Sequence, residues 1–524
     1  MPVGTAAYPV PSNALIVAPN GSDANAGTLA APMRTVKAAV ARASFGQTIV
    51  LRAGTYNEGF MINSGKDVTI QNYPDEAVWF DGSIPVTDWV QQGSTWVASG
   101  WTAQFDHSAS YTTGSDAGGW VNPSYPMAAY PDQVFVDGAQ LDQVASGQTP
   151  GPGQFAVDYS QHTLTIGTDP SGHELRASNL SSAFVVAGRL TLRGVGVRRY
   201  ATPMPQIGTI FFGGSTGGDV VENVVVKDNA TQGIGLGVQG CTLNHVTSVY
   251  NGLMGVAANT ASNSIVENSV LSFNNTQHFN PAPSAGGIKI ARSDHFVVRD
   301  NDVIDNAGVN GIWTDVTTTN FTIVHNTVIV DHGPYGILSE LSDTGVVAGN
   351  SVIGAKYGYT AFDTGNVKVF NNVFSNNSVW DIGLSQDERR NTDSRTSTVC
   401  PWLVRNVIVS DNVLGSNAAF QFYALDKASG TPASSMNITV AGNFFPTNST
   451  RPVMVGWGGG DNLTVTYYRT PSALDSGLGV DWHNAAATLD NSVNGSAQTF
   501  ATPLPSDVAT ALDAPVGTTR VGVI

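Results

Sequence analysis

The sequence predicts an all-β protein folded as a right-handed parallel β-helix, and two observations carry this prediction. An asparagine recurs at one point of a repeat, most often every 21 to 25 residues. Short alternating Val/Ile runs follow it with no helical pattern between them. A flat β-sandwich would not keep one register over so many repeats. The recurring residues are Asn223, Asn244, Asn268, Asn301, Asn326, Asn350, Asn371, Asn412 and Asn443.

Two consecutive coils show the repeat most clearly. One reads FVVRDNDVIDNAGVNGIWTD over 296–315, and the next reads FTIVHNTVIVDHGPYGILSE over 321–340. Each coil holds short strands separated by turns, with the asparagine at one of the turns. Asparagines stacked at the same turn of successive coils are expected to hydrogen-bond to one another along the axis.

Four segments follow from this repeat. Residues 14–83 are expected to form an N-terminal cap and the first coils, with an amphipathic helix in PMRTVKAAVARAS that covers the open end of the stack. Residues 84–178 break the period and have the alternation and turns of an inserted antiparallel β-rich subdomain. Residues 179–464 hold the main coils, and 465–524 are expected to form a C-terminal tail that packs on the helix.

Composition narrows the classes of function. Only 12% of residues are charged and the net charge is −16, which argues against a nucleic-acid partner and is compatible with a neutral glycan. No run of about 18 apolar residues predicts a membrane span. The polar, Lys-poor chain favours a secreted protein, expected to be a monomer or a weak homo-oligomer, although MPVGTAAYPV lacks the features of a signal peptide. Cys241 and Cys400 either form a disulfide or are two buried thiols.

A pair of carboxylates occupies the same position on the two coils. Asp315 lies 14 residues after Asn301, and Glu340 lies 14 residues after Asn326. Adjacent strands are about 4.8 Å apart, and a retaining glycosidase needs two carboxyl groups roughly 5–5.5 Å apart. Burial and mutual repulsion would raise the pKa of one of them, as an acid catalyst requires. The alternatives are two solvated acids on an exposed strand, or a calcium site along a turn.

Alternation within the strand predicts which side chains share a face with these acids. If Ile312 points into the coil, Trp313 and Asp315 point out of it. The preceding coil then places Lys289 beside Trp313, and the coil before that contributes Asn259. We therefore expect an outer groove with an exposed indole ring on which a sugar can stack, and polar groups for its hydroxyls.

Several other residues are weaker candidates. Lys289 and Arg292 form a basic pair of the kind that lyases use on uronates. His278 lies on a loop inserted before the Lys289 strand, and Asp363 lies within one residue of the register of Glu340. The charged segment 385–401 is expected to wall the groove or to form a surface loop. No His/Cys metal spacing and no phosphate loop are present, so no cofactor is expected, with structural calcium as an open alternative.

The stretches VAPNGSDANAGTLAAPMRTV and GGIKIARSDHFVVRDNDVIDNAGVNGIWTD, with GILSELS, resemble β-helix glycoside hydrolases of the retaining β-xylosidase type, within the pectate-lyase-like superfamily. The resemblance covers roughly 14–375 and is firmest over 286–345. It implies that Asp315 is the nucleophile and Glu340 the acid/base of a hydrolase acting on a plant or microbial glycan.

Lyases, C5-epimerases and phage tailspikes share the coil pattern. A uronate lyase or epimerase using Lys289 and Arg292, and a non-catalytic glycan-binding protein, therefore stay open as rival functions. Sugar identity, linkage, and exo or endo action are set by pocket loops and do not follow from the coils.

Overall fold

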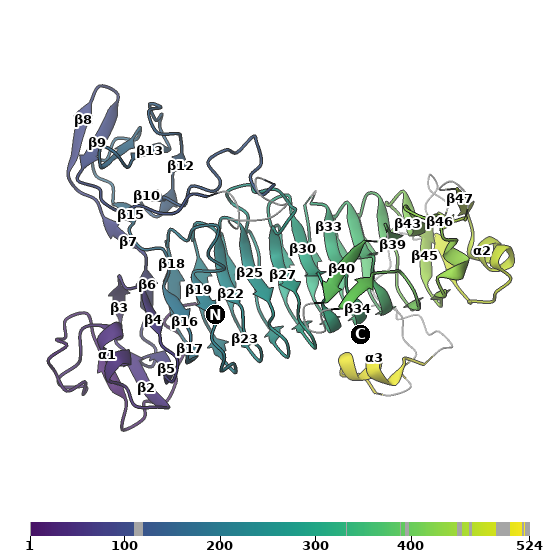
Figure 1. The fold of residues 1–524 in the computed structure, drawn as a ribbon, viewed down its shortest axis with the longest axis horizontal. Coiled ribbons are helices and arrows are strands. Elements are labelled where there is room, and N and C mark those ends of the chain that lie inside the picture. Colours follow the sequence, from purple (N-terminus) through teal and green to yellow (C-terminus); the bar gives the residue numbers. More distant parts are fainter. Residues whose placement is uncertain are drawn as a thin grey trace. The chain divides into compact units, whose positions relative to one another are not determined.

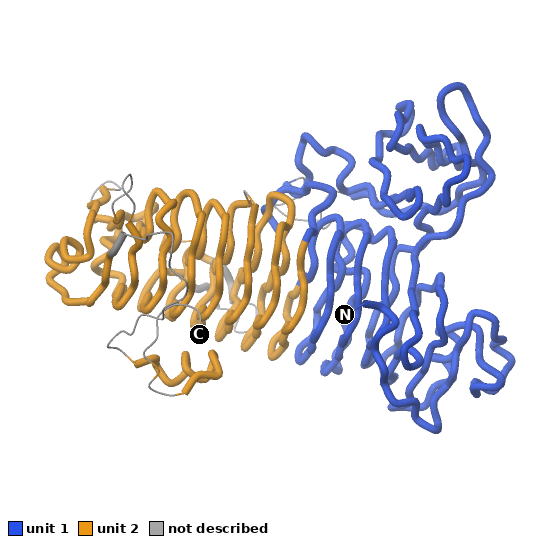
Figure 2. Tube along the Cα trace, turned by 180° about the vertical axis from the view of Figure 1, so that it is seen from behind, with its two compact units in different colours: residues 1–257, 273–285 blue, residues 258–272, 286–524 orange. Residues whose placement is uncertain are grey.

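The structure is a computed structural model of the chain, and it consists mainly of β-strands wound into stacked coils (Figure 1). Two compact units make up the chain: unit 1 comprises residues 1–257 and 273–285, and unit 2 comprises 258–272 and 286–524 (Figure 2). The structure describes residues 2–108, 119–331, 333–387, 389–393, 398–447, 453–460, 464–488, 503–515 and 518.

Unit 2 is built from three ladders of parallel strands, to which each regular coil contributes one strand apiece. The first ladder contains β26 (Ile265–Glu267), β28 (Val297–Arg299), β31 (Thr319–Val324), β34 (Asp343–Ala348), β37 (Gly365–Phe370), β42 (Val407–Ser410) and β44 (Ile438–Ala441). The second contains β27 (Gly286–Ala291), β30 (Asn310–Asp315), β33 (Tyr335–Glu340), β36 (Tyr357–Phe362), β39 (Trp380–Gln386), β43 (Phe420–Asp426) and β46 (Val455–Gly458), with β47 (Val465–Tyr468) antiparallel at its end. The third contains β29 (Asp302–Ile304), β32 (Thr327–Ile329), β35 (Ser351–Ile353) and β38 (Val373–Ser375).

Smaller elements interrupt or follow the coils of unit 2. The charged segment after β39 forms a hairpin, and a short 3-10 helix precedes β44. Val508 of helix α3 and the adjacent Leu512 pack in a cluster that includes Val324 and Ala348. These elements are β40 (Arg390–Asp393), β41 (Thr398–Pro401), η1 (Ala433–Ser435), β45 (Phe444–Thr447), α2 (Pro471–Leu478), β48 (Ala485–Thr488) and α3 (Ser506–Ala511).

Unit 1 begins with the same kind of coil. Its parallel ladders contain β1 (Leu15–Val17), β2 (Gln47–Leu51), β3 (Gly54–Tyr56), β4 (Phe60–Ile62), β5 (Asp67–Asn72), β6 (Val78–Asp81), β16 (Phe184–Val186), β17 (Arg189–Arg193), β18 (Gly196–Arg198), β19 (Ile210–Phe212), β20 (Val220–Glu222), β21 (Val225–Lys227), β22 (Gln232–Leu236), β23 (Thr242–Asn244), β24 (Thr247–Val249) and β25 (Met254–Asn259), in which the division between the units falls.

The predicted antiparallel insertion is present between these coils. Its strands pair mostly antiparallel around a core of their own that includes Phe155, Leu164 and Ile166. They are β7 (Ser83–Pro85), β8 (Trp89–Gln92), β9 (Thr95–Ser99), β10 (Val134–Val136), β11 (Ala139–Gln140), β12 (Asp142–Gln143), β13 (Gln154–Asp158), β14 (Thr163–Ile166) and β15 (Leu175–Ser178).

The predicted capping helix is α1 (Val36–Arg42). The Thr35 hydroxyl accepts a hydrogen bond from the backbone N–H of Ala38 and so caps the first turn. The helix contacts β1 and β2 and buries Val36, Ala39 and Val40, as the amphipathic pattern required.

The coil interior of unit 2 is filled by residues that repeat one above another. Ile288, Ile312, Ile337, Tyr359 and Ile382 pair in register along β27, β30, β33, β36 and β39, and all five are completely buried. The side chains between them in sequence therefore leave the coil on its outer face. This phase is the one that the sequence predicted.

An asparagine ladder runs along one turn of unit 2. Each Nδ2 donates to the Oδ1 of the next asparagine at 2.9 to 3.3 Å. The members are Asn301, Asn326, Asn350, Asn372, Asn412, Asn443 and Asn484.

Four of the predicted marker positions are wrong in detail. Asn223, Asn268 and Asn371 lie one residue before the ladder position, where the backbone has a positive φ of about 50°. Asn244 ends β23, and in the Asn371 coil the ladder residue is the neighbouring Asn372.

The described residues bear in part on two further expectations, the state of the cysteines and the absence of a membrane span. Cys241 is a buried thiol outside any disulfide, and the side chain of Cys400 lies outside the described residues. Within the part of the chain that the structure describes, no helix is long and apolar enough to cross a membrane.

Candidate active site

The two predicted acids lie at the ends of neighbouring strands of unit 2. Thr314 of β30 pairs with Ser339 of β33, so the next residues, Asp315 and Glu340, face each other one strand apart, at a spacing of about 4.8 Å. Thr314 and Ser339 point into the coil, where they are buried, and the two acids therefore project from its outer face. Both carboxyl groups are largely shielded, with side chains 9% and 13% exposed.

Asp315 is held by a cation and by a backbone donor. The Nζ atom of Lys289 lies 2.7 Å from Oδ2 of Asp315. The backbone N–H of Val316 donates to Oδ1 at 2.7 Å. Both oxygens thus have a charged or polar partner.

The neighbours of Glu340 act on its pKa in both directions. Burial raises the pKa of Glu340 above its usual range, and the negative charge of Asp315 raises it further. Arg389 opposes both effects, because one of its terminal nitrogens lies 2.6 Å from Oε1 of Glu340. The site therefore contains one carboxyl group in contact with an ammonium and a backbone N–H, beside another that binds its proton more tightly than an exposed glutamate does.

Arg389 is fixed by a second pair of acids. Its Nε lies 3.1 Å from Oδ2 of Asp363 and 2.9 Å from Oδ1 of Asp387. The backbone N–H of Asp387 donates to the other oxygen of Asp363 at 2.8 Å, and the guanidinium lies 4.5 Å from the ring centre of Phe362. Burial raises the pKa of Asp363. Since Phe362 pairs with Glu340, Asp363 lies one residue beyond that register, as the sequence predicted.

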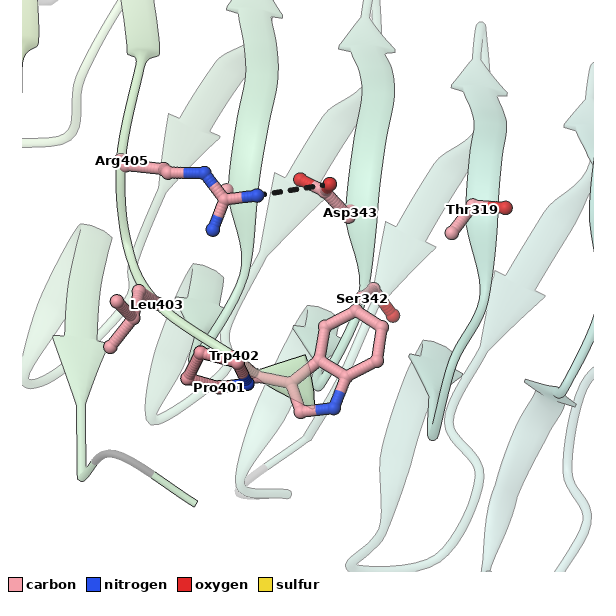
Figure 3. A pocket seen from close by; sticks show the side chains of 8 residues that line it. Thr319, Ser342, Asp343, Pro401, Trp402, Leu403 and Arg405 are labelled. Carbon is pink, nitrogen blue, oxygen red and sulfur yellow. Dashed lines mark hydrogen bonds and ion pairs between the residues drawn. The ribbon is translucent and has the colours of Figure 1, made fainter. Parts of the chain in front are cut away.

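Sequence reasoning noticed the charged segment 385–401 but did not single out Arg389. A second ion pair anchors the chain just beyond the segment: Arg405 pairs with Asp343 at 3.2 Å, three residues after Glu340 in the same coil (Figure 3). A cavity of about 140 Å³ lies there, and the Trp402 side chain covers part of it (Figure 3). It is lined by Thr319, Ser342, Asp343, Gly365, Pro401, Trp402, Leu403 and Arg405.

The expectation of an exposed Trp313 is wrong. Its indole is on the predicted outer face, since Trp313 pairs with Lys289 and Leu338, but it is only 4% exposed. The Lys289 ammonium lies 3.6 Å from the ring centre and covers it. Alternation fixes the side of the coil to which a residue points, not whether a neighbour then covers it. Trp313 supports Lys289 rather than offering an open ring to a sugar.

The remaining candidates are dispersed. Asn259 ends β25, and its Oδ1 is buried with no hydrogen-bond donor among the described residues. Arg292 is exposed, with φ +51°, one residue past Ala291, the partner of Asp315. His278 belongs to unit 1, where its ring stacks on Tyr125 with centroids 4.3 Å apart. Among the described residues no cluster of three or more His, Cys, Asp or Glu side chains could hold a metal ion, and calcium stays an untested prediction.

A family model described as a right-handed β-helix region matches residues 209–379. Two curated proteins match short segments. The uncharacterized protein YwoF of Bacillus subtilis is 42% identical over 72 residues, which is 13% of this chain and 15% of that protein. Pectate lyase PEL9 of Emericella nidulans is 39% identical over 74 residues, 13% and 18% of the two chains. The chain thus matches less than a fifth of either relative's length.

Solved structures extend the likeness over most of the chain. XylC, in complex with xylose, superposes with a TM-score of 0.61 at 16% identity, covering 77% of this chain and 76% of that one. The A-module of mannuronan C-5 epimerase AlgE4 from Azotobacter vinelandii gives a TM-score of 0.41 at 15% identity, with coverage of 76% and 86%. The family model and the XylC superposition confirm the predicted right-handed parallel β-helix.

Proposed function

We propose that the protein is a retaining glycoside hydrolase in which Asp315 is the nucleophile and Glu340 the acid/base. The observation that carries this proposal is the placement of two shielded carboxyl groups on adjacent strands, each beside a different cation. In the proposed roles Asp315 is the carboxylate, contacted by Lys289 and the Val316 N–H, and Glu340 is the protonated acid, whose pKa is raised by burial and by Asp315. A retaining mechanism needs both states at once in two groups roughly 5–5.5 Å apart.

Each step then has a group to perform it. An oxygen of Asp315 bonds to the anomeric carbon as the glycosidic bond breaks, and Glu340 gives its proton to the departing oxygen. The resulting ester removes the negative charge of Asp315, so the repulsion that raised the pKa of Glu340 disappears. Arg389, 2.6 Å away, stabilises the Glu340 carboxylate in this intermediate. Glu340 then takes a proton from water as that water releases the sugar from Asp315.

The rival uronate chemistry has less support. A lyase or epimerase base must offer a lone pair, but the Lys289 ammonium is engaged 2.7 Å from Asp315 and covers Trp313. The chain also carries a net charge of −16, which disfavours an anionic polymer. We therefore infer a neutral glycan as substrate, cleaved outside the cell by a monomer or weak homo-oligomer. XylC, whose structure was solved in complex with xylose, has the same fold, which is compatible with such a substrate.

The stereochemistry of the first product tests the proposal. Proton NMR during hydrolysis of a panel of aryl glycosides should show the anomer of the substrate configuration formed first, since adjacent strands leave no room for a water between Asp315 and the sugar. Asp315→Ala should abolish turnover. Asp343→Asn, an acid of the same coil that pairs with Arg405, serves as the matched control and should remain active. An inverted first product, or an unsaturated product absorbing in the ultraviolet, would contradict the assignment.

A further inference from the structure

The inserted segment of unit 1 contains a cavity of about 320 Å³ that is lined by aromatic rings. The rings of His107 and Tyr130 stack face to face, with centroids 4.8 Å apart and planes 8° from parallel. Tyr159 forms a third side, 6.2 Å from His107. Volumes of roughly 300–1,000 Å³ are typical of small-molecule sites.

A buried carboxylate faces this cavity without its full set of partners. Asp132 is 4% exposed, and the Tyr159 hydroxyl donates to its Oδ2 at 2.7 Å. Its Oδ1 is buried and, within the described part of the chain, accepts no hydrogen bond of normal length; the same is true of Oε1 of Gln143, which also lines the cavity. Burial raises the pKa of Asp132 to about 6, so at neutral pH the group is ionised. A buried carboxylate with so few strong donors is stabilised further when a ligand hydroxyl donates to it.

A second cavity adjoins the first. It has a volume of about 460 Å³ and shares Met127 and Gln143 with the first in its walls. Tyr125 and His278 line it and stack with centroids 4.3 Å apart. Two stacked aromatic pairs thus stand in neighbouring cavities, each beside side chains that accept hydrogen bonds.

We propose that the two cavities together bind a neutral oligosaccharide of at least two sugar rings. Aromatic faces cover the apolar faces of the rings, and polar side chains that line the cavity, Asp132 and Gln143 among them, offer acceptors for sugar hydroxyls. Asp132, Asp142 and Asp158 in the cavity walls repel anionic ligands. Because His107 and Tyr130 cover one face of each other, they do not form a cage of faces turned toward a cation. This site goes beyond the proposed hydrolase activity and does not depend on it.

Calorimetric titration of the full chain carrying Asp315→Asn and Glu340→Gln tests the site without turnover. Cellobiose, xylobiose and maltose are the saccharide probes, and choline is the cationic probe. At least one disaccharide should bind, and Tyr130→Ala or His107→Ala should weaken it tenfold or more. Tyr250→Ala removes an exposed ring of unit 1 that stacks on Phe273 outside both cavities, and should leave the affinity unchanged.

Other outcomes would overturn the proposal. It fails if none of the disaccharides binds, if binding is unaffected by Tyr130→Ala and His107→Ala, or if choline binds in competition. Both substituted residues have exposed side chains, and a melting curve of each variant verifies that it is folded. Since the titrated protein lacks both catalytic acids, a failure of the hydrolase assignment does not alter these results.

Discussion

Asp315 and Glu340 carry the same functional group, and their different neighbours separate their proposed roles. Lys289 reaches Asp315 from the preceding coil, whereas Arg389 reaches Glu340 from the segment inserted after β39. Each acid therefore has one cation, and the pKa of Glu340 is raised all the same, because burial and the charge of Asp315 outweigh Arg389. The roles depend on this difference more than on the identity of either acid.

Removal of Glu340 should affect substrates unequally. For substrates with poor leaving groups, kcat/KM of Glu340→Ala should be about 10²–10⁴-fold lower than that of the unsubstituted protein, because no acid protonates the departing oxygen. Dinitrophenyl glycosides, which leave without a proton, should lose far less in the bond-breaking step, and added azide should raise their turnover by replacing the activated water. Steady-state kinetics over a series of leaving groups measures this. Equal losses across the series would remove Glu340 from the role of acid.

We expect Arg389 to determine the pH above which activity falls. Glu340 must hold its proton to donate it, so activity is lost as pH rises through its pKa. In Arg389→Met the carboxylate loses a cation at 2.6 Å, the pKa of Glu340 rises further, and the alkaline limb of kcat/KM should move to higher pH. Arg405→Met, which breaks the Arg405 ion pair with Asp343, is the control and should leave the limb in place. A limb that moves down, or stays, would contradict this role for Arg389.

Within the coils, the asparagine pattern combines two different positions. At one, a residue with positive φ turns the chain, as at Asp300, His325 and Asn371. At the next, an asparagine joins the ladder, as at Asn301 and Asn326. Asparagine suits both, because it tolerates the left-handed region and also carries a donor and an acceptor. Sequence alone located the turn but was off by one residue where asparagine holds the positive-φ position, as at Asn223, Asn268 and Asn371.

One substitution in the ladder should destabilise the coils measurably. Oδ1 of Asn350 accepts from both the backbone N–H and the Nδ2 of Asn326. That Nδ2 also donates to the carbonyl oxygens of Val298 and Val324, so Asn350→Ala leaves one buried donor, the Asn326 backbone N–H, without its acceptor. At about 1–3 kcal/mol for an unsatisfied buried group, the free energy of unfolding should fall by at least about 1 kcal/mol. Urea denaturation would measure the change against Asn417→Ala, an exposed asparagine of unit 2 expected to stay within about 0.5 kcal/mol. If both variants had the same free energy of unfolding, the ladder would not contribute to stability.

For the chain as a whole, the sequence predicted the register of the repeated coils. It did not predict which side chains from other segments cover the site. Repeat spacing predicted the β-helix and placed Asp315 beside Glu340, because the register of stacked strands follows from sequence separation alone. The position of Arg389 depends on how an irregular insertion folds back, and no period encodes it. The burial of Trp313 depends likewise on the path of the Lys289 side chain across the ring. The acids were therefore predictable, whereas the groups around them were not.

The ladder also bears on how the protein ages. Asparagine deamidates when the backbone nitrogen of the next residue attacks the side-chain carbonyl, which makes it a thermolabile residue. After Asn326, Asn350 and Asn372 that nitrogen is already a donor, to the carbonyl oxygen of the ladder asparagine one coil earlier, at 2.8 to 2.9 Å. Both reacting groups are thus buried and held apart from attack. After prolonged incubation in mildly alkaline buffer, peptide mapping by mass spectrometry should find aspartate at the exposed Asn63 before it appears at any of these three. Early conversion of Asn350 would show that the coils open often enough to expose it. If Asn63 converts first, this asparagine-rich chain owes its resistance to deamidation to the stacking of the ladder rather than to its composition.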